Sequence, residues 1–122
     1  MRYISIFRAP TATANHPPNP KMFEQMQVFM AECVRAGVLL HTEGFGPSSP
    51  NDLKVRYENN QFTITDGPFA EAKEVIGGFA LMQTKTKAEL IEWTRKFLQI
   101  CGPGECEIHQ IADASPMDQF KK

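Results

Sequence analysis

The sequence has little net charge and no long apolar run. Its 122 residues carry 13 Lys and Arg against 14 Asp and Glu, which leaves a formal net charge of −1. Without a basic excess there is no broad field to attract phosphate backbones or anionic lipid, so we expect neither nucleic acid nor a membrane as a partner. No apolar stretch approaches the roughly 20 residues that a membrane-spanning helix needs. Because the first residues enter a strand-like pattern directly, we expect no secretion signal and a cytoplasmic protein.

Cysteine is also scarce, and its spacing lacks the close pairs of zinc ribbons and redox dithiols. The number of cysteines is odd, since the chain has only Cys33, Cys101 and Cys106. This favours reduced thiols at packing positions over a disulfide between Cys101 and Cys106. Cys33 lies within a stripe of Met and Phe and is predicted to be a buried, inert thiol. The histidines and acids show no diagnostic metal spacing, so we predict no metal and no cofactor.

What the sequence does have is the composition of one globular domain. With 42% hydrophobic and 22% charged residues, the chain is neither disordered nor unusual, and a chain of this length forms a single core. We predict one domain over residues 1–122. Within it, prolines exclude regular structure from a loop over residues 9–20, which contains His16, and residues 112–122 form a C-terminal tail.

Hydrophobic periodicity predicts six strands and two helices. The expected strands are 3–8, 38–45, 53–58, 62–65, 77–84 and 106–111, and the expected helices are 22–34 and 86–98. The hairpin over 53–65 should have one solvated and one apolar face. Without this hairpin, the order is the split β-α-β repeat of ferredoxin-like domains, an α+β fold with two helices on one face of an antiparallel sheet.

The strands over 3–8 and 77–84 carry apolar side chains on both faces. Because two helices cover only one face of the sheet, the other face would remain exposed in a monomer. A second copy, stacked sheet to sheet, would bury it in a symmetric homodimer. The alternative is that the tail or the proline-rich loop folds over this face, and we favour the homodimer.

An unusual stretch follows the hairpin: Asp66-Gly67-Pro68-Phe69-Ala70-Glu71-Ala72-Lys73-Glu74. Its first three residues form a chain-reversal signal. The stretch resembles the branch of the YCII-related family that is named after its DGPF motif, with Ala72 where that branch usually has Thr. The resemblance extends over essentially the whole chain and includes Ala36-Gly37-Val38-Leu39, Glu43-Gly44, Pro47, Gly78-Phe79, Glu92-Trp93 and Glu107-Ile108.

The resemblance implies a ferredoxin-like, dimeric α+β barrel whose biochemical role is largely uncharacterised. Some relatives in the wider family resemble enzymes with a His and Asp pair in a cleft. This chain has no histidine in its first helix, so only Asp66 carries over. Members of the branch often have Arg in the last strand, where this chain has His109. Family members are sometimes linked to sigma factors, which implies a transcription factor as a second kind of partner.

Three positions are candidates for acid–base chemistry. Asp66 would be the general acid or base, or else only a turn residue. His41 and Glu43 lie two residues apart in a strand, so their side chains share a sheet face and form a candidate pair; a solvated or structural histidine is the alternative. The expected ligand contacts are Arg8, Phe69, Glu71, Lys73 and His109. Arg8 would bind an anion or pair with Glu71 or Glu74.

These observations lead to two hypotheses. The first is a protein that binds a small organic molecule between sheet and helices, with cofactor-independent catalysis through Asp66 as its enzymatic form. The second is a non-catalytic module that recognises a metabolite or a protein such as a transcription factor. Fold analogy alone does not choose a reaction.

Overall fold

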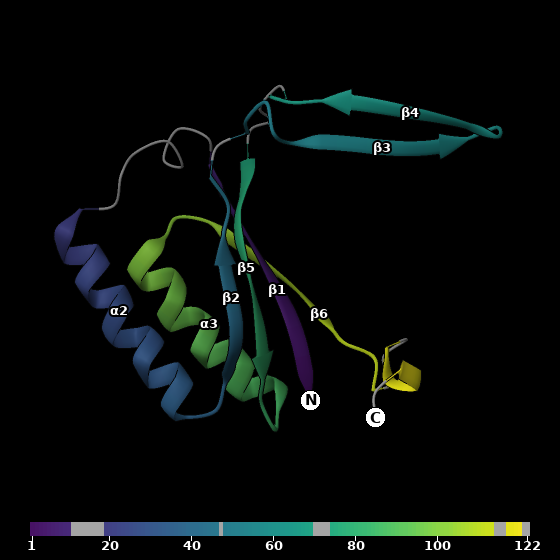
Figure 1. Ribbon diagram of the computed structural model, residues 1–122. Helices are drawn as coiled ribbons and strands as arrows, with labels where there is room; N and C mark the ends of the chain where they lie inside the picture. The colour runs from purple at the N-terminus through teal and green to yellow at the C-terminus, as the bar shows by residue number, and fades with distance from the viewer. Residues whose placement is uncertain (11–18, 47, 70–73, 114–116, 121–122) are drawn as a thin grey trace.

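The structure is a computed structural model that describes residues 1–10, 19–46, 48–69, 74–113 and 117–120. Its elements follow the predicted order (Figure 1). They are β1 (Arg2–Pro10), α2 (Pro20–Arg35), β2 (Leu39–Gly44), β3 (Leu53–Glu58), β4 (Gln61–Asp66), β5 (Glu74–Gln83), α3 (Lys87–Cys101), β6 (Glu105–Gln110) and the 3-10 helix η1 (Asp118–Phe120).

Four strands form one antiparallel sheet in the order β2-β5-β1-β6. Helices α2 and α3 lie together on one side of this sheet, and neither of them covers the other side (Figure 1). The predicted ferredoxin-like α+β fold is confirmed. The strands β3 and β4 form a separate two-stranded sheet.

Both ends of the predicted proline-rich loop belong to regular structure. Strand β1 extends to Pro10, and α2 begins at Pro20, so the predicted boundaries of 9–20 were too wide. A proline in the first helical turn loses no hydrogen bond, because the N–H groups there have no partner within the helix. Asn19 caps this helix by accepting a hydrogen bond from the Met22 amide at 2.7 Å. Residues 11–18, with His16, lie outside the described part of the chain.

Helix α3 has a reciprocal cap at its start. The Thr86 hydroxyl oxygen accepts from the Glu89 amide at 3.2 Å, and the Glu89 carboxylate accepts from the Lys85 amide at 3.3 Å. The helix continues three residues past its predicted end, to Cys101. Neither helix in the described part of the chain is long and apolar enough to cross a bilayer.

The core lies between the helices and the sheet. Its buried members are Tyr3, Val38, Met82 and Leu90, against which Ala80, Trp93 and Ile108 pack. The odd residues of β1, beginning with Tyr3, therefore face the helices, and Ile4, Ile6 and Arg8 face the opposite side. The face without helices is called the open face below.

The β3–β4 hairpin projects from the body as an arm (Figure 1). Asn59 and Asn60 form its turn with φ values of 51° and 62°, the left-handed conformation that tight hairpin turns require and that Asn tolerates. The predicted alternation is present, with apolar side chains on one face of the hairpin and polar side chains on the other. Every residue of both strands is exposed, including those of the apolar face. Among the described residues, no part of the main body covers the apolar face of the arm.

Candidate functional site

The open face carries two aligned rows of side chains. From β2 across β5 and β1 to β6, the first row is His41, Leu81, Ile4 and His109, and the second row is Glu43, Phe79, Ile6 and Glu107. Residues directly opposite each other in antiparallel strands share a face. Each row therefore has an apolar centre and a polar group at either edge of the sheet.

The β2 edge of the sheet holds two of the three predicted acid–base candidates, His41 and Glu43. His41 Nε2 lies 2.9 Å from Glu43 Oε2, and the His41 ring lies 6.0 Å from the Phe79 ring. The predicted proximity of the two side chains is confirmed. Both are more than half exposed, so this contact is an open surface pair rather than a buried catalytic dyad.

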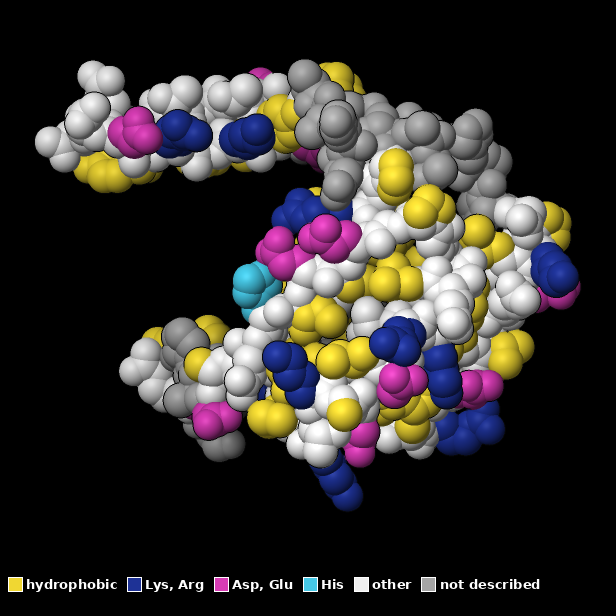
Figure 2. Space-filling view, turned by 180° about the vertical axis from the view of Figure 1, so that it is seen from behind, with side chains coloured by type: hydrophobic (Ala, Val, Ile, Leu, Met, Phe, Trp, Pro, Cys, Tyr) yellow, Lys and Arg dark blue, Asp and Glu magenta, His cyan; other side chains and the backbone are white. Residues whose placement is uncertain are grey.

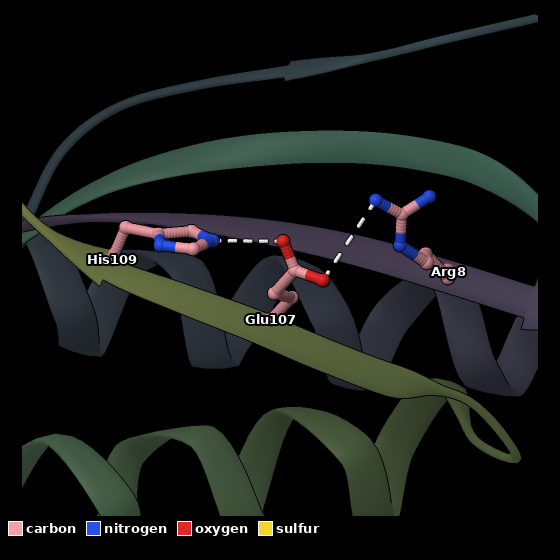
Figure 3. A network of polar contacts seen from close by, with 3 residues as sticks. All are labelled: Arg8, Glu107 and His109. Carbon is pink, nitrogen blue, oxygen red and sulfur yellow. Dashed lines mark hydrogen bonds and ion pairs between the residues drawn. The ribbon is translucent and has the colours of Figure 1, made fainter.

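The second edge holds a three-residue network on β6 and β1 (Figure 3). His109 Nε2 lies 2.7 Å from Glu107 Oε2, and Arg8 Nη2 lies 3.9 Å from Glu107 Oε1. The hydrogen bond from His109, and next the Arg8 charge, hold the pKa of the Glu107 carboxyl below its ordinary value. Sequence reasoning missed Glu107, although pairing β6 antiparallel to β1 would have brought it beside Arg8.

The structure does not test the predicted pairing of Arg8 with Glu71 or Glu74. Glu71 and Lys73 fall outside the described residues, as does the side chain of Glu74. Their predicted roles as ligand contacts remain predictions. Arg8 itself lies 3.9 Å from the Glu107 carboxylate and is partly exposed, so its predicted role as a ligand contact also stays a prediction.

Asp66 ends β4 and is exposed. In the turn that follows, Asp52 rather than Asp66 accepts the hydrogen bonds from backbone amides. The Asp52 carboxylate accepts from the Ser49 amide at 3.1 Å, and the Asp52 carbonyl accepts from the Gly67 amide at 2.7 Å. A Cβ atom on Gly67 would collide with the Ser49 carbonyl oxygen, so this close approach requires glycine. Within the described residues, the Asp66 carboxylate accepts no hydrogen bond.

Phe69 closes the same turn against the base of the arm. Its amide donates to Ser48 Oγ at 2.8 Å, and Lys54 Nζ lies 4.5 Å from the centre of its ring. These contacts give Phe69 a structural role at the base of the arm. Its predicted role as a ligand contact stays a prediction.

A cavity of about 310 Å³ lies between the sheet and the helices. Its walls are mainly apolar and come from both helices and from all four strands of the main sheet. The main contributors are Phe7, Met26, Phe29, Met30, Trp93 and Phe97. Asp66 does not line the cavity, so the predicted cleft exists but the predicted acid lies apart from it.

Two glycines that face each other across the sheet help to create this space. Gly44 of β2 pairs with Gly78 of β5, and both line the cavity. Neither supplies a side chain to fill the gap under the helices. Glycines within predicted strands could have indicated this gap from the sequence, because a strand glycine leaves a place without a side chain.

The polar groups of the cavity are few, and all are neutral except Glu43, whose carboxylate contacts His41. The Thr42 and Thr94 hydroxyls donate to the carbonyls of Phe79 and Leu90, each at 2.8 Å, so their oxygens remain available only as acceptors. Three cysteines also line it, and all are free thiols.

Burial keeps these thiols protonated. Desolvation raises the pKa of Cys33 to about 11 and that of Cys101 to about 12, and it also raises the pKa of Cys106. Cys33 is only 3% exposed, which confirms the predicted burial of this thiol. No three metal-ligating side chains gather within the described ranges.

The fold and the cavity together define a class, the ferredoxin-like α+β domains with an apolar pocket between sheet and helices. Comparison with protein families assigns the chain more closely, since the YCII-related domain matches residues 1–116. The chain therefore belongs to the YCII-related family, as the sequence resemblance implied. No curated protein matches it.

Proposed function

We propose that this protein is a homodimer that binds a small apolar organic molecule in the cavity between sheet and helices. The cavity itself carries the proposal. Its volume of about 310 Å³ lies at the lower end of the range for ligand sites, which are typically apolar with a few oriented polar groups. Within the family, the string Asp66-Gly67-Pro68-Phe69 supports membership of the DGPF branch.

The lining favours a particular ligand chemistry. Aromatic and thioether side chains contact planar or branched hydrocarbon groups well. The Thr42 and Thr94 oxygens are left as hydrogen-bond acceptors, so a ligand hydroxyl or N–H group would be matched and a ligand carboxylate would not. The expected ligand is a neutral aromatic or branched aliphatic molecule of on the order of ten non-hydrogen atoms.

The arrangement supports binding more than catalysis. Proton transfer requires a titratable group within hydrogen-bond reach of the ligand, and the cavity thiols are held in their protonated form. Glu43 borders the cavity, but its carboxylate contacts His41 on the open face. The enzymatic form of the hypothesis needs Asp66 at the ligand, and Asp66 lies elsewhere.

The homodimer is proposed from the open face. Its centre consists of Ile4, Ile6, Phe79 and Leu81, and the helices lie on the other side of the sheet (Figure 1). An apolar sheet face without a covering layer is typically buried against another layer about 10 Å away. A second copy supplies that layer with one self-complementary surface.

Trp93 allows a direct test of binding, because it is the only tryptophan of the chain and lines the cavity. We expect p-cresol to change its fluorescence saturably. Gly44→Leu should weaken this response at least tenfold by filling the cavity, since a Cβ there meets only the Gly77 oxygen at 3.9 Å. Gly46→Leu is the matched control, with nothing within 4 Å and no place in the lining.

Equal responses from the wild type and both leucine variants would contradict a site in the cavity. Asp66→Asn provides a second comparison. Because Asp66 does not line the cavity, this substitution should leave the p-cresol affinity unchanged.

A further inference from the structure

The arm presents an apolar surface on one face only. Leu53, Val55 and Tyr57 alternate along β3, and the last two lie opposite Ile64 and Phe62 on β4. The Tyr57 and Phe62 rings are 4.7 Å apart. These five side chains are 57 to 73% exposed, so the apolar face of the arm is one continuous surface in contact with solvent.

The other face of the arm is polar and needs no partner. Arg56 and Glu58 form an ion pair there at 3.5 Å, and Arg56 lies opposite Thr63. The two faces therefore differ as they would in a sheet that covers something on one side only. An isolated two-stranded hairpin is only marginally stable in water, and it becomes stable when its apolar face packs against another layer.

The exposed apolar area of the arm is too large to be incidental. Five large side chains with more than half of their surface exposed present on the order of 500 Å², near the upper end of the largest apolar patches on monomeric proteins. The largest apolar patch of a protein is often a functional surface, which makes the arm a candidate interaction surface.

The arm overhangs the open face. It extends from the body on the side away from the helices, and η1 near the C-terminus lies on that same side at the other end of the sheet (Figure 1). Hydrophobic side chains appear along the side of the arm that is turned toward the space between them (Figure 2). The open face is thus the floor of a notch between the arm and η1 (Figure 1).

The length of the arm suits a protein layer in the notch. Each arm strand has six residues, which corresponds to roughly 20 Å at the rise of an extended strand. Two sheets stack face to face about 10 Å apart. The arm therefore spans the full thickness of a sheet that is stacked on the open face.

The charge pattern of the floor is complementary to itself. A two-fold axis that runs across the strands, midway between the two rows, places His41 of each copy against Glu43 of the other. The same operation pairs His109 with Glu107 and aligns the apolar centres, in which Ile4 would meet Ile6. An isologous contact of this kind uses one surface twice.

From these observations we infer that the apolar face of the arm packs against a second copy of this chain that is seated in the notch. The inference rests on the proposed homodimer and assigns the arm as its clasp. The arm supplies more than half of the roughly 800 Å² that each partner buries in a standard interface, and the floor supplies the remainder. By symmetry, the arm of each copy packs against the other copy.

The test compares two faces of the same arm by sedimentation velocity over a dilution series. The double variant Val55→Thr with Ile64→Thr removes apolar contacts and keeps the β-branched shape that suits a strand. Arg56→Thr, on the polar face, is the matched control. Because each change occurs twice in a symmetric dimer, we expect the double variant to raise the dimer dissociation constant about 100-fold and the control to leave it nearly unchanged.

A variant of the floor separates failure of the arm from failure of the homodimer. If Ile6→Lys dissociates the dimer and the double variant keeps the wild-type constant, the homodimer stands and the inference about the arm is overturned. A wild-type chain that remains monomeric at every concentration overturns both.

Amide hydrogen exchange gives an independent measurement, since the amides of residues 53–66 should exchange slowly in the dimer and rapidly on dilution. Exchange there that does not depend on concentration would also overturn the inference.

Discussion

The facing glycines of β2 and β5 give a sharp prediction because the same substitution should have opposite effects at the two positions. A Cβ atom on Gly78 would lie 2.5 Å from the Glu43 carbonyl oxygen and 3.2 Å from the Gly44 Cα atom. A Cβ atom on Gly44 would meet only the Gly77 oxygen, at 3.9 Å, an ordinary contact distance. The two residues pair directly across the sheet. They differ mainly in how closely other atoms approach the added Cβ atom.

The expected magnitudes follow from these distances. Gly44→Ala should stabilise the fold by about 0.4–1 kcal/mol, because alanine restricts the unfolded chain and fits without strain. Gly78→Ala should destabilise it by about 1–3 kcal/mol, since the colliding atoms are backbone and the two strands must separate. The resulting difference of roughly 1.4–4 kcal/mol corresponds to a difference in Tm of about 5–15 °C for a domain of this size.

Thermal and urea denaturation, followed by circular dichroism and by Trp93 fluorescence, measure this difference. Both variants should retain the native spectrum at low temperature. If Gly78→Ala melts at or above the Tm of Gly44→Ala, the close approach of β2 to β5 that underlies the cavity is incorrect.

Two further predictions concern titratable groups. With its pKa raised to about 11, Cys33 should have on the order of a thousandth of its thiol ionised near pH 8, against roughly a quarter for a free cysteine. Iodoacetamide should therefore alkylate Cys33 at least about 100 times more slowly than it alkylates glutathione. A comparable rate would contradict the burial of Cys33. The Glu107 pKa, measured by NMR titration, should lie below the ordinary value and rise more in His109→Gln than in Arg8→Gln, because the hydrogen bond is the larger cause. A depressed folded-state pKa contributes stability above the ordinary glutamate pKa that is lost as the pH falls through the lower value, and the opposite order of the two variants would refute the assignment.

The order of the elements was predictable because hydrophobic periodicity is a local property. Alternation located all six strands, and the spacing of apolar residues located both helices. The same two-residue period placed His41 and Glu43 on one face, which the 2.9 Å contact confirms. Element ends were less predictable. Strand β5 begins at Glu74 rather than at residue 77, where charged residues and paired glycines obscure the pattern.

The separation of Asp66 from the cavity was not predictable from the sequence. A motif shows which residues are unusual, but the turn that follows β4 is held by contacts between the segments 48–52 and 67–69. Those contacts give Asp52 the capping role and leave Asp66 at the surface. Only the packing of two segments that are distant in the chain decides this.

The sequence by itself determined the secondary structure, the ferredoxin-like order and which residues would share a face, because these depend on neighbours along the chain. The tertiary structure alone decided that Glu107 joins Arg8 to His109, that Gly44 and Gly78 leave a cavity beneath the helices, and that the arm extends beyond the body. Alternation can assign an apolar face to a hairpin, but whether that face is covered depends on the layers around it, and these form only when the whole chain is folded.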